Sequence, residues 1–270
     1  MRTIAVVNQK GGAGKTTTSV QLAAGLAERG WRVVACDMDA QANLTGTLMG
    51  EAEQPKYAPT MYELLTGEAS VDEVMVACRR CDLIPASRHN KRLSIIDAAI
   101  GDMPNKLYHL REALLAVAGR YDFAVIDTPP ARDTLAYNAL TAADSIIIPV
   151  QAQYLPAKGM TELVKTIMRV KRQINPELKI DGVLLTLVDA RTNLAKQVER
   201  DIRRDYGSVL RVFDARVPIA VRAAEASAYG QSIFAYDRRG KVAEAYAALA
   251  KEVASLGERK RTPSEPALAR

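Results

Sequence analysis

The segment 9–17, which reads QKGGAGKTT, constrains the fold of this chain more than any other feature. An apolar run at 4–7 precedes it and predicts a buried strand. Apolar residues at helical spacing follow it as far as residue 28, and Gly30 indicates the end of that helix. A glycine-rich turn between a strand and a helix N-terminus is typical of a phosphate-binding loop, because glycines let backbone N–H groups close around phosphate oxygens.

The chemistry of such a loop predicts roles for its polar residues. Lys15 is expected to reach the β- and γ-phosphates of a nucleotide, and the Thr16 hydroxyl to ligate Mg²⁺. The match to G-x-x-x-x-G-K-[ST] is incomplete, since Gln9 occupies the first glycine position and a second lysine, Lys10, lies inside the loop. We expect the loop to bind ATP through Lys10, Gly11, Gly12, Ala13, Gly14, Lys15, Thr16 and Thr17.

Acidic residues follow two of the predicted strands. A strand at 31–37 ends in Asp37, with Asp39 two residues further on, and a strand at 121–127 ends in Asp127. Ligands of α/β sheets bind at the carboxyl ends of the strands. We therefore predict that Asp39 orients or activates the attacking water and that Asp127 holds Mg²⁺ through its water shell.

Predicted strands and helices alternate along the chain. The further strands are expected at 82–85, 145–150, 182–187 and 209–213, and the further helices at 61–65, 106–118, 159–174, 194–206 and 241–256. This alternation predicts an α/β fold with a mostly parallel, doubly wound sheet, helices on both faces and the layout of a P-loop NTPase. We expect one domain over 1–257, followed by a disordered charged tail at 258–270.

Composition excludes several other classes of protein. No apolar run approaches the roughly 20 residues of a membrane span, and no signal peptide precedes the first strand, so we expect a cytoplasmic protein. The cysteines are Cys36, Cys78 and Cys81, an odd number that argues against a disulfide framework. Cys78 and Cys81 have C-x-x-C spacing, but a zinc site needs about four ligands and the chain has only two histidines, so we expect reduced thiols.

The loop K-G-G-x-G-K-T resembles the deviant Walker A motif of the ParA/MinD superfamily. The likeness continues through D-T-P-P at 127–130, the segment 138–144, I-P-V-Q at 148–151 and 189–194, and more loosely through 217–226. The chain is most similar to the ParA/Soj branch, which partitions chromosomes and plasmids. It departs from the family pattern D-x-D-P-Q-G-N at Ala40 and Ala42, and from I-P-R-N-V-R at Ile219 and Ala220.

This resemblance implies a Mg²⁺-dependent ATPase that forms a homodimer with ATP at the interface. Lys10 would reach across that interface to the partner's phosphates, which makes it catalytic together with Lys15 and Asp39. Asp189 and Pro218 would bind the nucleotide at its adenine end. The dimer would bind double-stranded DNA without sequence preference and associate with the nucleoid, and a ParB-type centromere-binding protein would stimulate an otherwise slow hydrolysis.

The charge distribution favours DNA as a partner. Segment 191–222 holds eight basic and four acidic residues, which is +4 of the chain's net +6, and Lys196, Arg203 and Arg222 are the predicted DNA contacts. One alternative is a ParA-like ATPase that positions a protein cargo. Another is a MinD-like, membrane-cycling ATPase, but the segment 259–266 contains prolines and has no apolar face. An iron-sulfur reductase of the nitrogenase iron-protein type would need cysteines after the strand at 121–127, where none stands.

Overall fold

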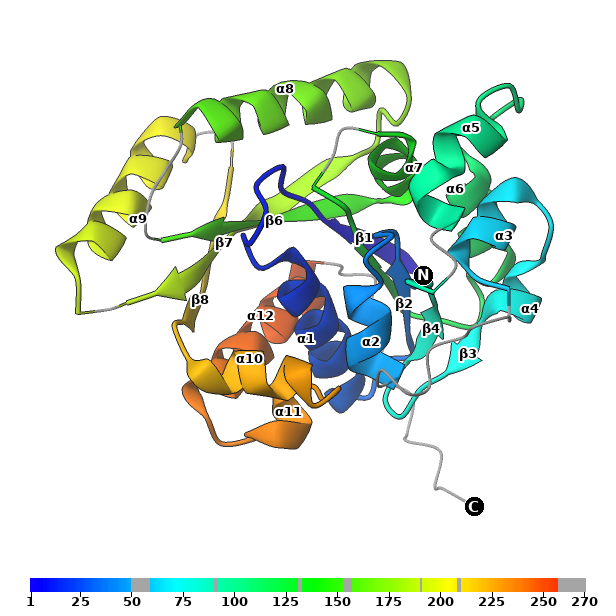
Figure 1. Ribbon diagram of the computed structural model, residues 1–270. Coiled ribbons are helices and arrows are strands. Elements are labelled where there is room, and N and C mark those ends of the chain that lie inside the picture. The colour runs from blue at the N-terminus through cyan, green and yellow to red at the C-terminus, as the bar shows by residue number, and fades with distance from the viewer. Residues whose placement is uncertain are drawn as a thin grey trace.

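An eight-stranded sheet with the order β3-β4-β2-β5-β1-β6-β7-β8 crosses the middle of the computed structural model (Figure 1). The structure describes residues 1–49, 59–89, 92–130, 133–152, 157–189, 191–207 and 210–256. The strands are β1 (Arg2–Val6), β2 (Val33–Asp37), β3 (Val76–Ala77), β4 (Asp82–Ile84), β5 (Phe123–Asp127), β6 (Ser145–Gln151), β7 (Lys179–Val188) and β8 (Val212–Pro218).

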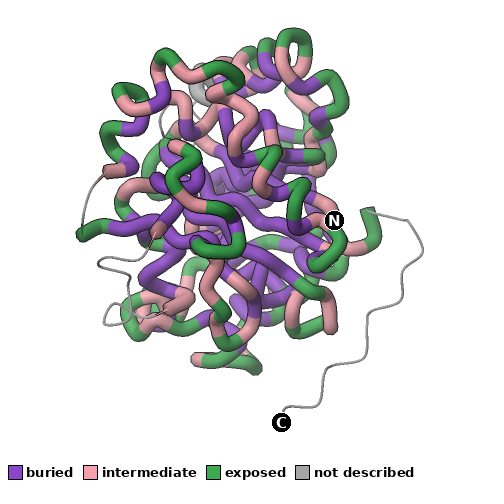
Figure 2. Tube along the Cα trace, turned by 90° about the vertical axis from the view of Figure 1, so that its right-hand side faces the viewer, coloured by how far each residue is buried: buried purple, intermediate pink, exposed green. Residues whose placement is uncertain are grey.

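The sheet is parallel except at one edge, as the sequence predicted. β1 lies between β5 and β6 and pairs in parallel with both, whereas the short β3 pairs antiparallel with β4. The central strands are buried and largely apolar, with polar residues at their ends, because helices cover them on both sides. Figure 2 shows this buried backbone at the centre of the molecule.

Helices cover both faces of the sheet, which confirms the doubly wound arrangement. The bounds are α1 (Lys15–Glu28), α2 (Asn43–Met49), α3 (Met61–Thr66), α4 (Val71–Val74), η2 (Arg92–Ile95), α5 (Ile96–Ile100), α6 (His109–Ala116), α7 (Thr134–Ala142), α8 (Ala157–Gln173), α9 (Asn193–Tyr206), α10 (Val221–Ala228), α11 (Ile233–Tyr236) and α12 (Lys241–Leu256).

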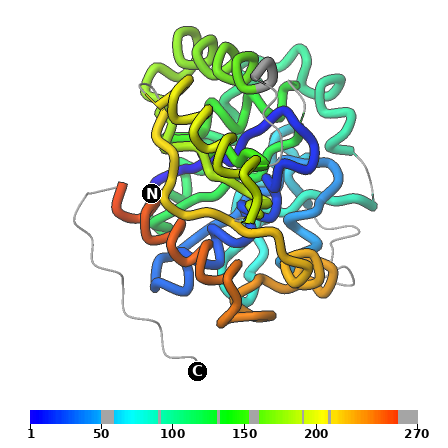
Figure 3. The backbone as a smooth tube through the Cα atoms, turned by 90° about the vertical axis from the view of Figure 1, so that its left-hand side faces the viewer, coloured from blue at the N-terminus to red at the C-terminus, as the bar shows by residue number. Residues whose placement is uncertain are grey.

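Two apolar cores result from this layering. One holds Leu22 of α1 and Tyr246 of α12, together with residues of α10 and α11. The other holds Leu114 of α6, Ile167 of α8 and Ile202 of α9. Figure 3 shows α12 running alongside α1, where the Thr18 and Tyr246 hydroxyls lie 3.4 Å apart.

The structure differs from the sequence prediction mainly near the C-terminus. The strand predicted at 209–213 is β8, which begins at Val212 and continues to Pro218. Its inward residues alternate with the exposed Asp214 and Arg216, so its second half has no continuous apolar run to reveal it. Several short helices were not predicted, among them α7, whose first turn is capped by the Asp133 carboxylate, which accepts a hydrogen bond from Ala136 N at 3.0 Å.

The predicted tail at 258–270 lies outside the described residues. Within the described part of the chain, no helix combines the length and the apolar character needed to cross a bilayer.

Candidate functional site

The loop between β1 and α1 adopts a shape that only glycine takes easily at two positions. Gly12 and Gly14 have φ angles of 72° and 86°, in the left-handed region. Gly14 is also the N-cap of α1, where no side chain caps the helix. The N-terminus of this 14-residue helix therefore faces the loop with its positive dipole end, a ready site for an anion.

Two polar side chains from the neighbouring strands hold the loop in this shape. Gln151 at the end of β6 donates through Nε2 to the carbonyl of Gly12 at 2.6 Å. Thr186 of β7 donates through Oγ1 to the carbonyl of Ala13 at 3.0 Å. Both carbonyls are thus turned toward the strands. The Lys10 amide donates to Asn8 Oδ1 at 2.9 Å, and the amides that follow it face the N-terminus of α1, where they can bind a ligand.

The two lysines of the loop have different surroundings. Lys15 is only 7% exposed, and its Nζ lies 3.4 Å from the carbonyl oxygen of Lys10. Burial lowers the pKa of Lys15, and the charges of Asp127 and Asp39 oppose that effect. Lys10 is exposed, and its Nζ donates to Gln151 Oε1 at 3.3 Å. Lys15 is thus part of the site within one chain, whereas Lys10 stands at the surface above it.

Asp37 and Asp127 are paired neighbours at the carboxyl ends of β2 and β5, and both are fully buried. Asp37 Oδ2 accepts from Thr45 N at 2.8 Å and from Thr45 Oγ1 at 2.7 Å, and its Oδ1 accepts from Asp39 N at 3.1 Å. Burial raises the pKa of Asp37 to about 6. The Asp37 carboxylate therefore anchors the start of α2. Of the two acids that follow β2 in the sequence prediction, Asp37 and Asp39, only Asp39 is accessible.

The Asp127 carboxylate has one oxygen engaged and one free among the described residues. Oδ1 accepts from Ser19 Oγ at 2.9 Å, and Oδ2 is buried with no hydrogen-bond partner in the described part of the chain. Burial first, and then the charge of Asp37, raise the pKa of Asp127 to about 8, while the nearby hydroxyls of Thr16 and Ser19 lower it. An unpartnered buried carboxylate oxygen beside a threonine hydroxyl fits a hard cation and its water shell.

Asp39 is half-buried just beyond β2, where its Oδ1 accepts from Gln41 N at 2.9 Å. Its charge acts on both Lys15 and Asp127, which places it at the same site. The second predicted acid is thus brought together with the loop.

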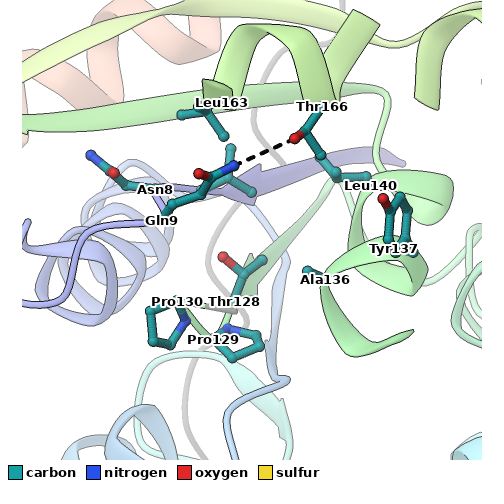
Figure 4. A pocket seen from close by; sticks show the side chains of 11 residues that line it. Asn8, Gln9, Thr128, Pro129, Pro130, Ala136, Tyr137, Leu140, Leu163 and Thr166 are labelled. Atoms are coloured by element: carbon teal, nitrogen blue, oxygen red, sulfur yellow. Dashed lines mark hydrogen bonds between the residues drawn. The ribbon is translucent and has the colours of Figure 1, made fainter. Parts of the chain in front are cut away.

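A small apolar pocket adjoins the loop (Figure 4). Asn8 and Gln9 line one side of it, Pro129 and Pro130 another, and α7 and α8 close it. The Gln9 Nε2 group reaches across to Thr166 Oγ1 of α8 at 3.4 Å. The pocket therefore connects the two residues before the loop to α8.

The predicted adenine contacts lie at the same edge of the sheet, at the ends of β7 and β8. Val188 pairs with Pro218, and Ile219 N donates to Val188 O at 3.2 Å, so Asp189 and Pro218 are brought close. The Asp189 carboxylate accepts from the Arg191 guanidinium through both oxygens at 2.9 Å. These bonds lower the pKa of Asp189 to about 2.

Sequence reasoning missed the residues that support the site from other elements. Ser19 donates a hydrogen bond to Asp127, Thr45 donates one to Asp37, and Thr186 donates one to a carbonyl of the loop. None of the three belongs to a motif from which the site was predicted. Ser19 alone carried a local signal, because it lies one helical turn after Lys15 and so faces the same side.

Comparisons with known proteins agree with this geometry. A family profile described as an AAA domain matches residues 1–180. The chromosome partitioning protein ParA of Caulobacter vibrioides is 39% identical over 260 residues, which cover 94% of each chain. The chain belongs to the ParA/Soj family of chromosome-partitioning ATPases.

Two further comparisons extend this similarity. The sporulation initiation inhibitor protein Soj of Bacillus subtilis is 41% identical over 258 residues, covering 94% of this chain and 98% of that protein. A Mycobacterium smegmatis structure described as cobyrinic acid a,c-diamide synthase with bound ADP and magnesium is 31% identical, with a TM-score of 0.83 over 97% of this chain and 98% of that one. The fold predicted from the sequence is the fold these proteins share.

Two departures from the ParA/Soj pattern can be located in the structure. Ala42 stands where the pattern has glycine, and it keeps a left-handed φ of 51° while fully buried. The loop after Asp39 therefore follows a glycine-like path in spite of the alanine. Ile219 and Ala220 replace an arginine and an asparagine, and they leave Ile219 49% exposed beside Pro218.

The predicted DNA contacts of this ParA/Soj chain lie on two helices that pack into different cores. Lys196 and Arg203 are exposed on α9, whose apolar side belongs to the core with α8, and Arg222 is exposed on α10, which belongs to the opposite core. In Figure 1, α9 lies on the side of α8, and α10 lies beyond the end of β8 beside α11. Arg203 shares Glu199 with Arg216, at 3.1 Å and 2.6 Å. Arg222 pairs with Asp237 at 3.2 Å.

Proposed function

We propose that this partitioning ATPase binds and hydrolyses ATP at the 10–17 loop, dimerises around the nucleotide, and in that state binds DNA without sequence preference. One observation carries the proposal. The desolvated ammonium of Lys15 interacts with the charges of Asp127 and Asp39, while a second lysine is exposed on the same loop. A buried cation at an uncapped helix N-terminus has no better partner than a phosphate group.

The residues for magnesium fit the same proposal. Thr16 and Asp127 would hold Mg²⁺, Asp127 through water, and the ion would neutralise charge on the β- and γ-phosphates. The unpartnered Oδ2 of Asp127 supports this assignment, since a cation or its bound water would satisfy that atom. Asp39 would orient the attacking water, because its carboxylate is the accessible one of its pair.

Lys10 would make the nucleotide part of the dimer interface. A single loop already has Lys15 for its own phosphates, and Lys10 is exposed and directed to Gln151 at the surface. A second chain docking on this surface would place Lys10 beside the partner's triphosphate, in an environment with less water and stronger charge interactions. Dimerisation would then depend on ATP.

The proposed partners follow from the family and from the charge. Exposed cations on α9 would contact DNA phosphates, which is a sequence-independent interaction. A ParB-type centromere-binding protein would stimulate hydrolysis. Asp189 and Pro218 would bind the nucleotide at its adenine end, with Asp189 oriented by Arg191.

The proposal is tested by two substitutions that separate binding from hydrolysis. Lys15→Ala removes the main charge on the phosphates, so calorimetry with Mg-ATP should show no binding. Asp39→Ala should bind ATP but accumulate as a dimer in sizing chromatography, because hydrolysis no longer releases it. If Lys15→Ala bound ATP as tightly as the parent, the assignment of the loop as the nucleotide site would be wrong. A monomeric Asp39→Ala, or one with parental hydrolysis, would remove Asp39 from the mechanism.

A further inference from the structure

The short loop that carries Asp39 lacks two residues that would make it rigid by itself. We call residues 39–43 the Asp39 loop. The ParA/Soj pattern has a proline and a glycine in it, where this chain has Ala40 and Ala42. Proline fixes its own φ and glycine takes a left-handed φ without strain, whereas Ala42 has to hold a φ of 51°. The local sequence therefore does not favour the observed path, and contacts from elsewhere in the chain have to stabilise it.

Hydrogen bonds inside the Asp39 loop set the direction of the Asp39 carboxylate. Gln41 N donates to Asp39 Oδ1 at 2.9 Å, and Ala42 N donates to Asp39 O at 2.9 Å. The first bond orients the carboxylate, and the second closes the turn that runs through Ala42. Because both donors belong to residues 41–42, a shift of these two residues would move the carboxylate as well.

Arg88 reaches the Asp39 loop from the neighbouring strand of the sheet. β4 ends at Ile84 and pairs in parallel with β2, so the segment after β4 lies beside the loop at the carboxyl edge of the sheet (Figure 1). The Arg88 guanidinium donates through Nε to Gln41 O at 3.2 Å and through Nη2 to Asn43 Oδ1 at 3.1 Å. These acceptors lie on either side of Ala42 in the chain, so one planar group spans the left-handed residue.

The backbone that carries Arg88 is itself firmly held. Ala86 N donates to Thr45 Oγ1 at 3.0 Å, and both of these residues are fully buried. Ser87 is buried as well, whereas Arg88 is exposed. The side chain therefore extends from a fixed segment over the surface of the loop. A guanidinium suits this task because its donors have a fixed geometry relative to one another, which a lysine ammonium lacks.

We propose that Arg88 is a positioning residue for ATP hydrolysis, which holds the Asp39 loop in the conformation that lets Asp39 orient the attacking water. The inference rests on the role proposed for Asp39 above. Both of the Arg88 bonds described here go to the Asp39 loop, whereas ATP binding is assigned to residues 10–17. Loss of the Arg88 side chain should therefore slow hydrolysis and leave nucleotide affinity as it is.

The test compares single-turnover hydrolysis of radiolabelled Mg-ATP with ATP affinity from calorimetry. Arg88→Ala should hydrolyse about 10-fold more slowly, because a misplaced catalytic group costs rate more than binding. Its Kd for Mg-ATP should equal that of the parent. Arg88→Lys should also be slow, since it keeps the charge but not the two linked donors.

Arg120→Ala is the matched control. Arg120 is likewise an exposed arginine with a side-chain acceptor, here Asp72, but it precedes β5 at the opposite edge of the sheet. This variant should hydrolyse ATP like the parent. Urea midpoints of Arg88→Ala and Arg120→Ala should agree, because both side chains are exposed, and agreement would show that slow hydrolysis is not caused by partial unfolding.

A double-mutant cycle tests whether Arg88 acts through Asp39. Adding Arg88→Ala to Asp39→Ala should not slow hydrolysis any further, since the group that Arg88 positions is already absent. An arginine that acted on the phosphates directly would slow both backgrounds by the same factor and would also weaken ATP binding when removed. Either of these results would overturn the proposal, as would parental hydrolysis by Arg88→Ala or Arg88→Lys.

Failure of this inference can be told apart from failure of the proposed function. A slow Asp39→Ala together with a parental Arg88→Ala contradicts the role of Arg88 alone. An Asp39→Ala variant that hydrolyses ATP like the parent contradicts the proposed role of Asp39 and, with it, the positioning role of Arg88.

Discussion

Replacing Thr45 by valine should destabilise the protein strongly, although the two side chains have nearly the same shape. The Thr45 hydroxyl donates to Asp37 Oδ2 at 2.7 Å and accepts from Ala86 N at 3.0 Å. Thr45 and Asp37 are fully buried, so water cannot replace either bond. Thr45→Val leaves a carboxylate with one donor fewer and an N–H group with no acceptor.

The cost follows from these two bonds. A hydrogen bond to a charged group contributes about 1.5–3 kcal/mol, and an orphaned buried N–H group costs about 1–3 kcal/mol. Since one hydroxyl makes both bonds, we expect the free energy of unfolding to fall by about 3 kcal/mol. Thr45→Ser keeps the hydroxyl and removes one methyl group, so it should cost only about 0.8 kcal/mol.

The loss should also depend on pH. Burial raises the folded-state pKa of Asp37 to about 6, above the usual value of about 3.9, and the Thr45 hydroxyl limits that rise. A carboxyl with a raised pKa contributes its full stability below the unfolded value and loses it as pH rises through the folded value. Through Asp37, the parent should lose stability between about pH 4 and pH 6, and Thr45→Val should extend this loss above pH 6. The raised pKa of Asp127 adds a loss up to about pH 8 in both proteins, so the difference between variant and parent carries the test.

Urea unfolding of the nucleotide-free protein, repeated from pH 5 to pH 8, measures both effects. The slope against urea should stay constant, so that the midpoints report stability directly. Thr45→Val with the same midpoints as Thr45→Ser across this range would refute the role of the hydroxyl as the anchor of Asp37.

Two other predictions concern the loop and the DNA surface. Gly14→Ala forces a left-handed φ of 86° on an alanine and places its Cβ 3.6 Å from Thr186 Cγ2. It should lower the free energy of unfolding by about 1–2 kcal/mol and weaken ATP binding. The control is Gly11→Ala, whose Cβ would have no atom within 4 Å, and equal melting temperatures of the two variants would contradict the loop geometry. With ATP present, Lys196→Ala should reduce the slope of log affinity for DNA against log salt by about 0.9. Arg203→Ala should reduce it by less, because Glu199 already pairs with Arg203. Equal slopes for the parent and Lys196→Ala would show that α9 does not contact DNA.

The sequence was sufficient for those parts of the fold and site that depend on local pattern. The glycines of the loop, the apolar strand before it and the helix after it lie within one stretch of chain, so their roles could be predicted together. Asp37, Asp39 and Asp127 were also found, because each follows a buried strand. It was not predictable that Asp37 anchors α2 and that Asp39 stays accessible, because this difference depends on the hydrogen bond that Thr45 of α2 donates to Asp37.

What depended on tertiary register was not predictable. Gln151 and Thr186 donate hydrogen bonds to carbonyls of the loop because β6 and β7 end beside it. The spacing of these residues along the chain does not reveal that proximity. The packing of α9 with Lys196 and of α10 with Arg222 into different cores was also not predictable from the sequence. Conversely, Glu28 pairs with both Arg80 and Arg238, although the three residues lie far apart in the sequence.

The association state of Lys10→Ala with Mg-ATP, measured by analytical ultracentrifugation beside nucleotide affinity, tests the central claim most directly. The Lys10 side chain is exposed and its Nζ donates to Gln151 of β6, so its removal should leave ATP binding by the monomer intact. We predict that the variant binds nucleotide like the parent but stays monomeric, and loses ATP-dependent DNA binding and stimulated hydrolysis. If Lys10→Ala dimerises as tightly as the parent, the nucleotide is not shared across an interface, and the loop is an ordinary single-chain ATP site.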